Sequence, residues 1–202
     1  MKGSETKERL LRIGLDQTSV HGLAGVTLGQ LASASGLSKS GLFAHFRSKE
    51  QLQIDLLDVM AQLGDRVIVE PAMCTAEGLP RLIAVVDLWF GWSGRAGLSG
   101  GCPVAGAMFE LDDIDSDVRD HAAKIEARWR EQLSMFVLEA KFLGHLTDDT
   151  DVDQFVWELY GIYLSHHVSS RFLRDGDAGA RAKTAFDALV RRHQPPCVSA
   201  QG

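Results

Sequence analysis

Four side chains in one short stretch carry groups that bind phosphate oxygens and the edges of nucleic-acid bases. Lys39 and Lys49 supply ammonium groups, Ser40 a hydroxyl and His45 an imidazole. Such donors form hydrogen bonds with phosphates, and in a groove they also read base edges. These residue types, this close together, therefore predict binding of a polyanion.

Two short helices joined by a glycine turn would hold these side chains in place. Thr27 is suited to cap the first helix, which ends at Gly36, because glycine adopts a left-handed turn most easily. Ser38 begins the second helix, on which Leu42 and Phe46 are four residues apart and face inward. The outward positions are Lys39, Ser40, Phe43 and His45. This is the layout of a helix-turn-helix DNA reader.

The stretch resembles the signature of the tetracycline-repressor (TetR) family of bacterial one-component regulators. The resemblance spans residues 7–55 and is carried by Gly36-Leu37-Ser38, Phe43-Ala44-His45-Phe46, Ser48-Lys49-Glu50 and Leu52. The family usually has a tyrosine where Phe43 stands. The ring is therefore kept, and the hydroxyl that would donate to a phosphate is lost.

The pattern and the resemblance together predict a DNA-binding surface. Lys39 and Ser40 would read base edges or nearby phosphates. His45 and Lys49 would hold phosphates, and Thr27 would fix the start of its helix on the DNA backbone. The expected set is Thr27, Ser38, Lys39, Ser40, Phe43, His45 and Lys49. Simple packing of three helices, the plainer interpretation, explains the apolar residues but not the polar ones on the outer side.

Charge is unevenly distributed along the chain, whose formal net charge is −6. Residues 1–50 carry seven Lys/Arg against four Asp/Glu, which gives +3, so the remainder carries −9. Only the amino-terminal part has the sign that DNA attracts. The 202 residues, 45% hydrophobic and 24% charged, are typical of a globular protein of one or two domains. Because no apolar run reaches eighteen residues, we expect a cytoplasmic protein.

Helical periodicity continues beyond residue 49, without a convincing strand pattern. The expected helices cover 49–69, capped by Ser48 and ended by Pro71, and then 80–92, 103–109, 115–143, 151–173 and 179–193, with a flexible loop at 94–101. We therefore predict an all-α protein with three parts. They are a three-helix helix-turn-helix DNA-binding domain (1–50), a helical ligand-binding and dimerisation domain (51–194) and a disordered tail (195–202).

The helix expected over 151–173 carries two apolar stripes, which implies two packing partners. One stripe would face the domain's own core. The other would meet a second copy of the chain in a four-helix bundle, as in proteins similar to this one. The expected dimer contacts are Phe155, Leu159, Ile162 and Tyr163. Alternatively, both stripes are buried within one protomer.

The resemblance also implies a sensor pocket in the carboxy-terminal half. Pockets are mostly apolar and carry a few polar groups. The candidate lining consists of Trp89, Trp92, Cys102, Met108, Phe109, Trp129, Phe136, Tyr160 and His166. Taken singly, each aromatic residue is better explained as core than as a ligand contact, so these residues are proposed only as a group. The sequence does not identify the inducer.

Cys102 directly precedes Pro103, the expected first residue of a helix, and thiols at helix amino termini are often reactive. This segment resembles the Gly-Cys stretch of TetR-type repressors that sense electrophiles or oxidants. The alternative is a buried small apolar residue. The three cysteines lack paired spacing, so neither a disulfide framework nor a zinc site is indicated.

The chain contains no nucleophile elbow, P-loop or dinucleotide fingerprint, and no metal-ligand motif. We therefore expect no enzyme activity, catalytic residue, metal or cofactor. An all-helical enzyme using Asp112, Asp113 and Asp115 is a remote alternative, as is a helical adaptor that has lost DNA binding. The favoured prediction is a homodimeric repressor, released from a palindromic operator by a small apolar or aromatic inducer.

Overall fold

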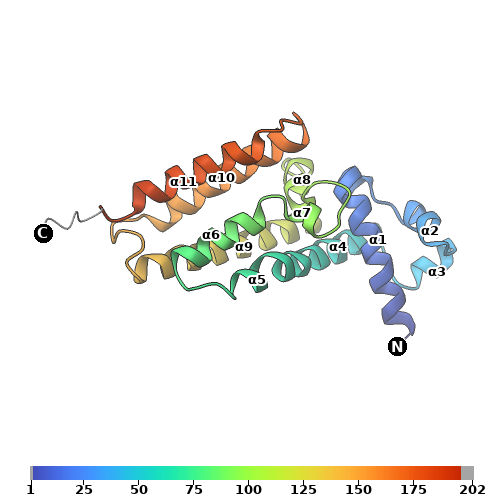
Figure 1. The fold of residues 1–202 in the computed structure, drawn as a ribbon. Helices are drawn as coiled ribbons and strands as arrows, with labels where there is room; N and C mark the ends of the chain where they lie inside the picture. The colour runs from blue at the N-terminus through green and yellow to red at the C-terminus, as the bar shows by residue number, and fades with distance from the viewer. Residues whose placement is uncertain (1, 197–202) are drawn as a thin grey trace, which may run out of the picture. The chain divides into compact units, whose positions relative to one another are not determined.

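The computed structural model describes residues 2–196, apart from the side chains of residues 2–4 and Lys39 (Figure 1). This described part consists of helices and their connections and has no strand, which confirms the predicted all-α class. Most of the expected tail, including Cys197, lies outside the described residues. No helix within residues 2–196 is long and apolar enough to cross a membrane.

Contacts divide the chain into two units. The first unit combines Met1–Val67 with Gly91–Arg128, and the second combines Ile68–Phe90 with Trp129–Gly202. The helix-turn-helix segment therefore shares its unit with residues from the middle of the chain, whereas the sequence suggested a boundary after residue 50.

The first unit contains α1 (Lys2–Gly25), α2 (Leu28–Ser35), α3 (Lys39–Phe43), α4 (Lys49–Gly64), α7 (Trp92–Arg95), α8 (Pro103–Glu110) and the start of α9 (Asp117–Phe142). Helix α1 packs against α2, α4 and α8. The core of this unit consists of large side chains with no solvent exposure, among them Leu10, Leu23, Leu31, Leu42 and Phe46.

Local capping chemistry sets the helix boundaries around α2, α3 and α4. The hydroxyls of Thr27, Ser38 and Ser48 accept hydrogen bonds from the backbone three residues later. Caps were predicted at Thr27 and Ser48, and Ser38 was predicted only to begin its helix. Gly36 ends α2 with a left-handed φ of 71°, also as predicted. Helix α3 ends at Phe43, earlier than expected, so His45 lies in the turn that follows it.

Three other segments differ from the sequence-based expectation. The helix expected over 80–92 is interrupted at Gly91, which has a left-handed φ of 73°. Helix α4 continues as a π-helical segment, Asp65–Val69, into the short α5 (Glu70–Ala72), so Pro71 lies inside a helix instead of ending one. The loop expected over 94–101 contains the end of α7, and it is hydrogen-bonded to α1.

The second unit contains α5, α6 (Leu79–Trp89), the end of α9, α10 (Val152–Arg171) and α11 (Ala178–His193). Helices α10 and α11 lie side by side (Figure 1). The buried Arg81 joins α6 to α9 through a 2.7 Å ion pair between its Nη1 and Glu139 Oε1. Because an unpaired buried charge is strongly disfavoured, this pair holds the two helices in register.

Candidate nucleic-acid interface and ligand-binding region

The outward side of α3 presents a small polar and aromatic surface. Ser38 and Ser40 are exposed, and their hydroxyl oxygens are 3.0 Å apart. The Phe43 ring is 56% exposed, although it is a large apolar group. Lys39 is the first residue of α3, and its side chain lies outside the described residues. The structure therefore places the described outward residues of α3 at the surface, as the sequence predicts.

His45 and Thr27 flank this surface with different constraints. The His45 backbone N–H donates to the Leu42 carbonyl at 2.8 Å, which fixes the turn after α3. The Thr27 hydroxyl takes part in a capping box with Gln30, whose side chain accepts from the Thr27 backbone N–H at 3.1 Å. Thr27 therefore orients the start of α2 through its own hydrogen bonds.

Lys49 has a partner that the sequence did not reveal. Its Nζ donates to the Ala24 carbonyl oxygen at 2.8 Å, which joins the start of α4 to the end of α1. An ammonium group has three donors, so this bond leaves capacity for a phosphate. The pKa of the neighbouring Glu50 lies below its ordinary value, first because its carboxylate accepts its own backbone N–H and then because of Ser48.

The amide groups of Leu23 and Ala24 form a second contact that sequence reasoning missed. Both backbone N–H groups donate to the Glu110 carboxylate at the end of α8, at 3.1 and 2.8 Å. The Leu23 carbonyl accepts from Gln53 Nε2 of α4 at 3.0 Å. Backbone groups carry no sequence signature, so nothing in the chain's pattern indicated this junction.

An aromatic cluster occupies the second unit. Trp89 lies at its centre and stacks on Tyr163, with ring centroids 4.0 Å apart. Trp129 meets Trp89 edge-on at 5.2 Å, and Tyr160 is tilted against it at 5.5 Å. Phe90 extends the cluster, because its ring contacts Tyr163 and stacks on His166 at 5.2 Å. Trp89, Trp129, Tyr160 and His166 were all expected in a ligand pocket, and Phe90 was not.

Polar groups are embedded in this aromatic cluster. The indole Nε1 of Trp129 is buried and has no hydrogen-bond partner within the described part of the chain. The Arg130 guanidinium carbon lies 3.9 Å from the centre of the Tyr160 ring, a cation–π distance. Burial lowers the pKa of His166 and, with the nearby charge of Arg171, that of His167. Both shifts favour the neutral form of the imidazole.

The remaining residues of the expected pocket are distributed between the two units. Phe136 belongs to the second unit and is almost fully buried. The members in the first unit are Trp92, Cys102, Met108 and Phe109. Trp92 is buried, whereas Phe109 is 59% exposed and so does not line an enclosed space in its own unit. Cys102 is partly exposed at the N-cap of α8, where its thiol makes no capping hydrogen bond.

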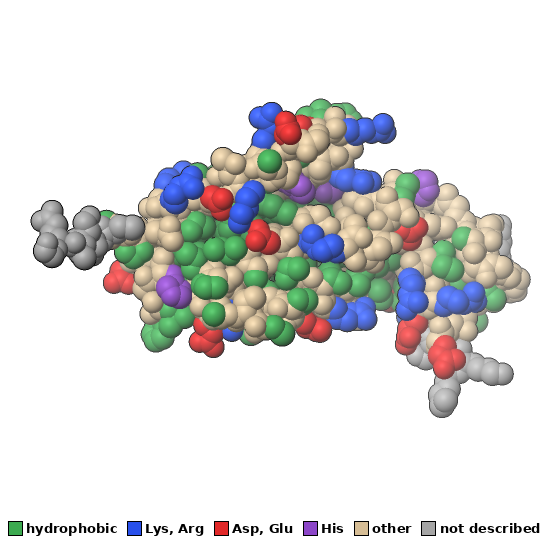
Figure 2. Space-filling model, viewed as in Figure 1, with side chains coloured by type: hydrophobic (Ala, Val, Ile, Leu, Met, Phe, Trp, Pro, Cys, Tyr) green, Lys and Arg blue, Asp and Glu red, His purple; other side chains and the backbone are tan. Residues whose placement is uncertain are grey.

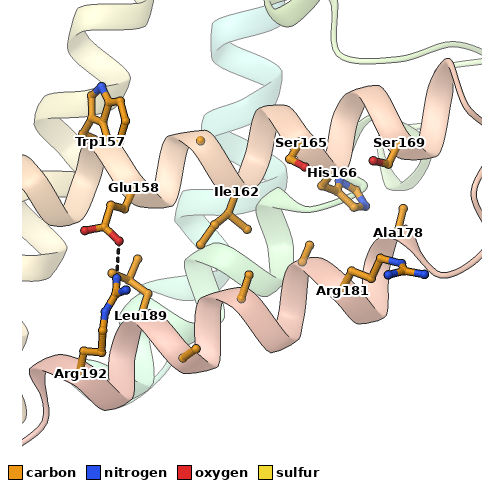
Figure 3. A pocket seen from close by; sticks show the side chains of 14 residues that line it. Trp157, Glu158, Ile162, Ser165, His166, Ser169, Ala178, Arg181, Leu189 and Arg192 are labelled. Atoms are coloured by element: carbon orange, nitrogen blue, oxygen red, sulfur yellow. Dashed lines mark hydrogen bonds and ion pairs between the residues drawn. The ribbon is translucent and has the colours of Figure 1, made fainter.

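An open groove of about 600 Å³ runs between α10 and α11 (Figure 3). Small residues form most of its floor: Gly161, Ser165, Ala178, Ala182, Ala185 and Ala188. Larger apolar side chains, Trp157, Ile162 and Leu189, lie among them. An ion pair between Glu158 and Arg192 crosses one end of the groove, and Arg181 lies towards the other end (Figure 3). This surface is concave, mostly apolar and open to solvent.

Three of the four expected dimer contacts are wrong. Phe155, Leu159 and Tyr163 have almost no exposure within the single chain, and Tyr163 stacks on Trp89. The fourth expected contact, Ile162, lines the groove between α10 and α11. The buried face of α10 also includes Val156 and Tyr160. The opposite face is open, with Trp157 66% and Phe172 83% exposed.

Hydrophobic side chains also gather at the surface over α6 and α9 (Figure 2). The exposed large apolar residues of α9 are Met135, Leu138 and Phe142, and the exposed Leu143 directly follows the helix. They follow one side of the helix, opposite its buried residues Leu133, Val137 and Ala140.

Comparison with known protein families covers both parts of the chain. Residues 10–56 match the family described as bacterial regulatory proteins, tetR family. Residues 78–186, more than half of the chain, match the tetracyclin repressor-like, C-terminal domain. The chain belongs to the TetR family.

Solved structures of TetR-family regulators have the same fold as this chain. A TetR regulator from Chloroflexus aurantiacus is 25% identical, with a TM-score of 0.82 over 94% of each chain. A TetR-family regulator from Cytophaga hutchinsonii is 19% identical, with a TM-score of 0.86 over 96% of this chain and 97% of that one. FadR from Bacillus subtilis, solved with stearoyl-CoA, is 16% identical, with a TM-score of 0.73 over 91% and 97%. No curated protein sequence matches significantly.

Membership of the TetR family assigns the general activity. The protein is a DNA-binding transcription regulator with a ligand-binding carboxy-terminal domain. TetR-family proteins are regulators and not enzymes, which confirms the expectation that the chain is not an enzyme.

Proposed function

We propose that this TetR-family regulator is a homodimeric repressor that a small apolar or aromatic inducer releases from a palindromic operator. The observation that carries this proposal is the exposed surface of α3, where Ser38, Ser40 and Phe43 face solvent between two capped helices. Packing of the unit alone does not account for an aromatic ring that is 56% exposed.

On DNA, α3 would lie in the major groove. Lys39 and Ser40 would reach base edges or nearby phosphates, because they are in the first turn of the recognition helix. His45 and Lys49 would bind the phosphate backbone beside that groove. Thr27 would present the amino end of α2 to the adjacent phosphate, since backbone N–H groups and the helix dipole favour an anion there.

The groove between α10 and α11 supports a two-fold dimer. Its floor of glycine, alanine and serine permits close approach of a helix from a second copy, and Trp157 and Ile162 would be buried by that approach. The groove therefore replaces the buried stripe as our proposed dimer surface. A pair of helices from each chain would form an isologous four-helix bundle, and two-fold symmetry would provide two reading helices for a palindrome.

The aromatic cluster around Trp89 supports an inducer with an apolar or aromatic body. The unpartnered Trp129 N–H and the neutral imidazoles of His166 and His167 would orient a polar group on such a molecule. Because the B. subtilis FadR structure contains stearoyl-CoA, acyl-CoA thioesters belong among the first probes.

Selection of bound duplexes from a random DNA pool tests the proposed function. We expect enrichment of a palindrome whose half-sites are about one helical turn, or a multiple of it, apart. In a salt titration on that duplex, the logarithm of the association constant should fall steeply and linearly with the logarithm of the salt concentration. Enrichment of no sequence, or of a single half-site bound by one chain, would contradict the proposal.

A matched pair of lysine variants tests the phosphate contact. Lys49→Ala should weaken binding to all duplexes and reduce the salt slope by about one unit, because one phosphate contact releases about one counterion. Lys124→Ala removes the same charge from an exposed position on α9 and should leave the slope unchanged. Equal slopes for the two variants would remove Lys49 from the contact set.

Release by the inducer is measured on the same duplex. Stearoyl-CoA, shorter acyl-CoA thioesters and free coenzyme A would be titrated against the protein–operator complex, with tryptophan fluorescence as a second readout. The proposal requires a molecule that lowers operator affinity, since an inducer must bind the DNA-incompetent state more tightly. An acyl-CoA that quenches fluorescence but leaves operator affinity unchanged would be a ligand without an inducing role.

A further inference from the structure

We propose that Glu110 and Gly22 fix α1 to α8, so that α8 controls the position of α2 and α3, the helices of the DNA-binding surface. We call this pair of residues the latch, and the inference rests on the proposed function. The latch acts on the Leu23–Ala24 junction, the dipeptide at the end of α1. Thr27, the cap of α2, follows Ala24 by only three residues. Glu110 is the last residue of α8, in the part of the chain that matches the carboxy-terminal family domain.

Glu110 holds both amide groups of the junction with one carboxylate. Its Oε1 accepts from Leu23 N at 3.1 Å and its Oε2 accepts from Ala24 N at 2.8 Å. Hydrogen bonds to a charged acceptor are stronger than neutral ones, and two parallel bonds also fix direction. A displacement of α8 must therefore either move Leu23 and Ala24 or leave two backbone donors without this partner.

Helix α4 holds the carbonyl side of the same junction. Gln53 Nε2 donates to the Leu23 oxygen at 3.0 Å, in a buried position, and Lys49 Nζ donates to the Ala24 oxygen at 2.8 Å. All four backbone polar groups of the dipeptide are thus bound by side chains of α8 or α4. Lys49 is also our proposed phosphate contact, so the junction connects α8 directly to a DNA-binding residue.

Gly22 makes the latch sterically possible. Its φ of 76° and ψ of 170° are non-helical and interrupt α1, and the next two N–H groups donate to Glu110. A Cβ at this position would lie 2.1 Å from Glu110 Oε1, far inside contact distance. Only glycine satisfies both the left-handed φ and the close approach of the carboxylate.

The connection just before α8 is also hydrogen-bonded to α1, so α1 holds the chain at both ends of α8. Gly101 N donates to the Ser19 carbonyl and Gly100 N donates to the Ser19 hydroxyl, both at 2.9 Å. Ser99 N donates to Asp16 Oδ1 at 2.8 Å. With both ends held, a shift of α8 is transmitted to α1 and to the Leu23–Ala24 junction together.

Operator affinity of full-length variants tests the latch, because Glu110 is a positioning residue with no proposed DNA contact. Glu110→Ala should weaken binding to the selected operator at least tenfold with an unchanged salt slope, since no phosphate contact is lost. Glu110→Gln keeps one acceptor and should have an intermediate effect. Asp113→Ala removes an exposed carboxylate just after α8 and should bind like the wild type.

Hydrogen exchange provides a readout that does not depend on DNA. The Leu23 and Ala24 amides should exchange faster in Glu110→Ala, while the amides of α10 keep their wild-type rates. Unchanged exchange at Leu23 and Ala24 would show that Glu110 does not hold them and would overturn the latch. Wild-type operator affinity in Glu110→Ala would overturn it equally, because the junction would then have no influence on reading.

Gly22→Ala extends the test in case Glu110→Ala destabilises the unit. The added methyl displaces the Glu110 carboxylate, so Gly22→Ala should weaken operator binding, and adding Glu110→Ala should cause little further loss. Fully additive losses would mean that the two residues act separately and would refute the latch. If the wild-type protein itself selects no operator, the proposed function fails first, and that outcome is distinct from normal binding by a latch variant.

Discussion

Gly100→Ala is the sharpest test of how the loop before α8 is held. The substitution adds one methyl group where the backbone of α1 is already in contact. A Cβ at Gly100 would lie 1.8 Å from the Ser19 carbonyl oxygen and 2.1 Å from its carbon, whereas real Cβ contacts are not shorter than 3.0 Å. These atoms belong to rigid backbone, so the loop has to move away from α1.

The size of the effect follows from the hydrogen bonds that such a movement breaks. A shift of more than 1 Å would separate Gly100 N and Gly101 N from Ser19, at a loss of about 1 kcal/mol for each neutral bond. The bond from Ser99 N to the Asp16 carboxylate would weaken at the same time. We therefore expect Gly100→Ala to lower the free energy of unfolding by about 2–4 kcal/mol.

Gly94→Ala is the matched control, because it places the same methyl group in the same connection. Gly94 lies in α7, and its Cβ would meet no atom within 4 Å. Alanine is the better helix former, so this variant should be neutral or stabilised by up to about 1 kcal/mol. Urea unfolding followed by circular dichroism measures both variants. If Gly100→Ala unfolds at the same urea concentration as Gly94→Ala, the loop is not docked on α1 and our reasoning is wrong.

Four further predictions concern the reading helix, the dimer, pH and the thiol. Lys39→Ala should relax preference at one symmetric pair of operator positions by about 1–3 kcal/mol, whereas equal losses on specific and random DNA would make it a phosphate contact. Gly161→Glu should be a monomer by light scattering, whereas the control Gly64→Glu should be a dimer. A Cβ at either position meets no atom within 4 Å, but only Gly161 lies in the groove between α10 and α11. If both variants are dimers, the interface lies elsewhere. Burial holds the pKa of His167 below 6.5, so the unfolded chain binds a proton at a higher pH than the folded chain. The free energy of unfolding should therefore decrease as the pH falls below about 6.5, and His167→Gln should make this decrease smaller. If the Cys102 thiol is a sensor, N-ethylmaleimide should label Cys102 faster than Cys74 and should release operator DNA. Equal labelling rates, or the same release from Cys102→Ser, would exclude sensing through Cys102.

Features that depend on a few neighbouring residues could be predicted from the sequence. The caps at Thr27, Ser38 and Ser48 and the left-handed Gly36 follow from the local preferences of hydroxyl side chains and glycine. The all-α class followed from periodicity, which averages over many residues.

Features that depend on distant backbone atoms could not be predicted. Glu110 binds amide groups 86 and 87 positions earlier, and any residue other than proline supplies such an amide. Gly100 read as a flexible loop residue, because the close approach of Ser19 is visible only in three dimensions. Tyr163 was assigned to the wrong face of α10, since a helix with apolar residues on most sides does not reveal from its pattern which side meets Trp89.

The first unit is assembled from segments that are separated along the chain, and this affects its formation during synthesis. Helices α1 to α4 leave the ribosome well before Glu110, so the Leu23 and Ala24 amides have no carboxylate partner while the intervening residues are translated. At bacterial elongation rates this interval is on the order of 4–17 s. In a nascent chain, α1 to α4 are therefore not yet fixed to α8. If tight operator binding needs this contact, the regulator acquires it only after Glu110, near the middle of the chain, has been translated.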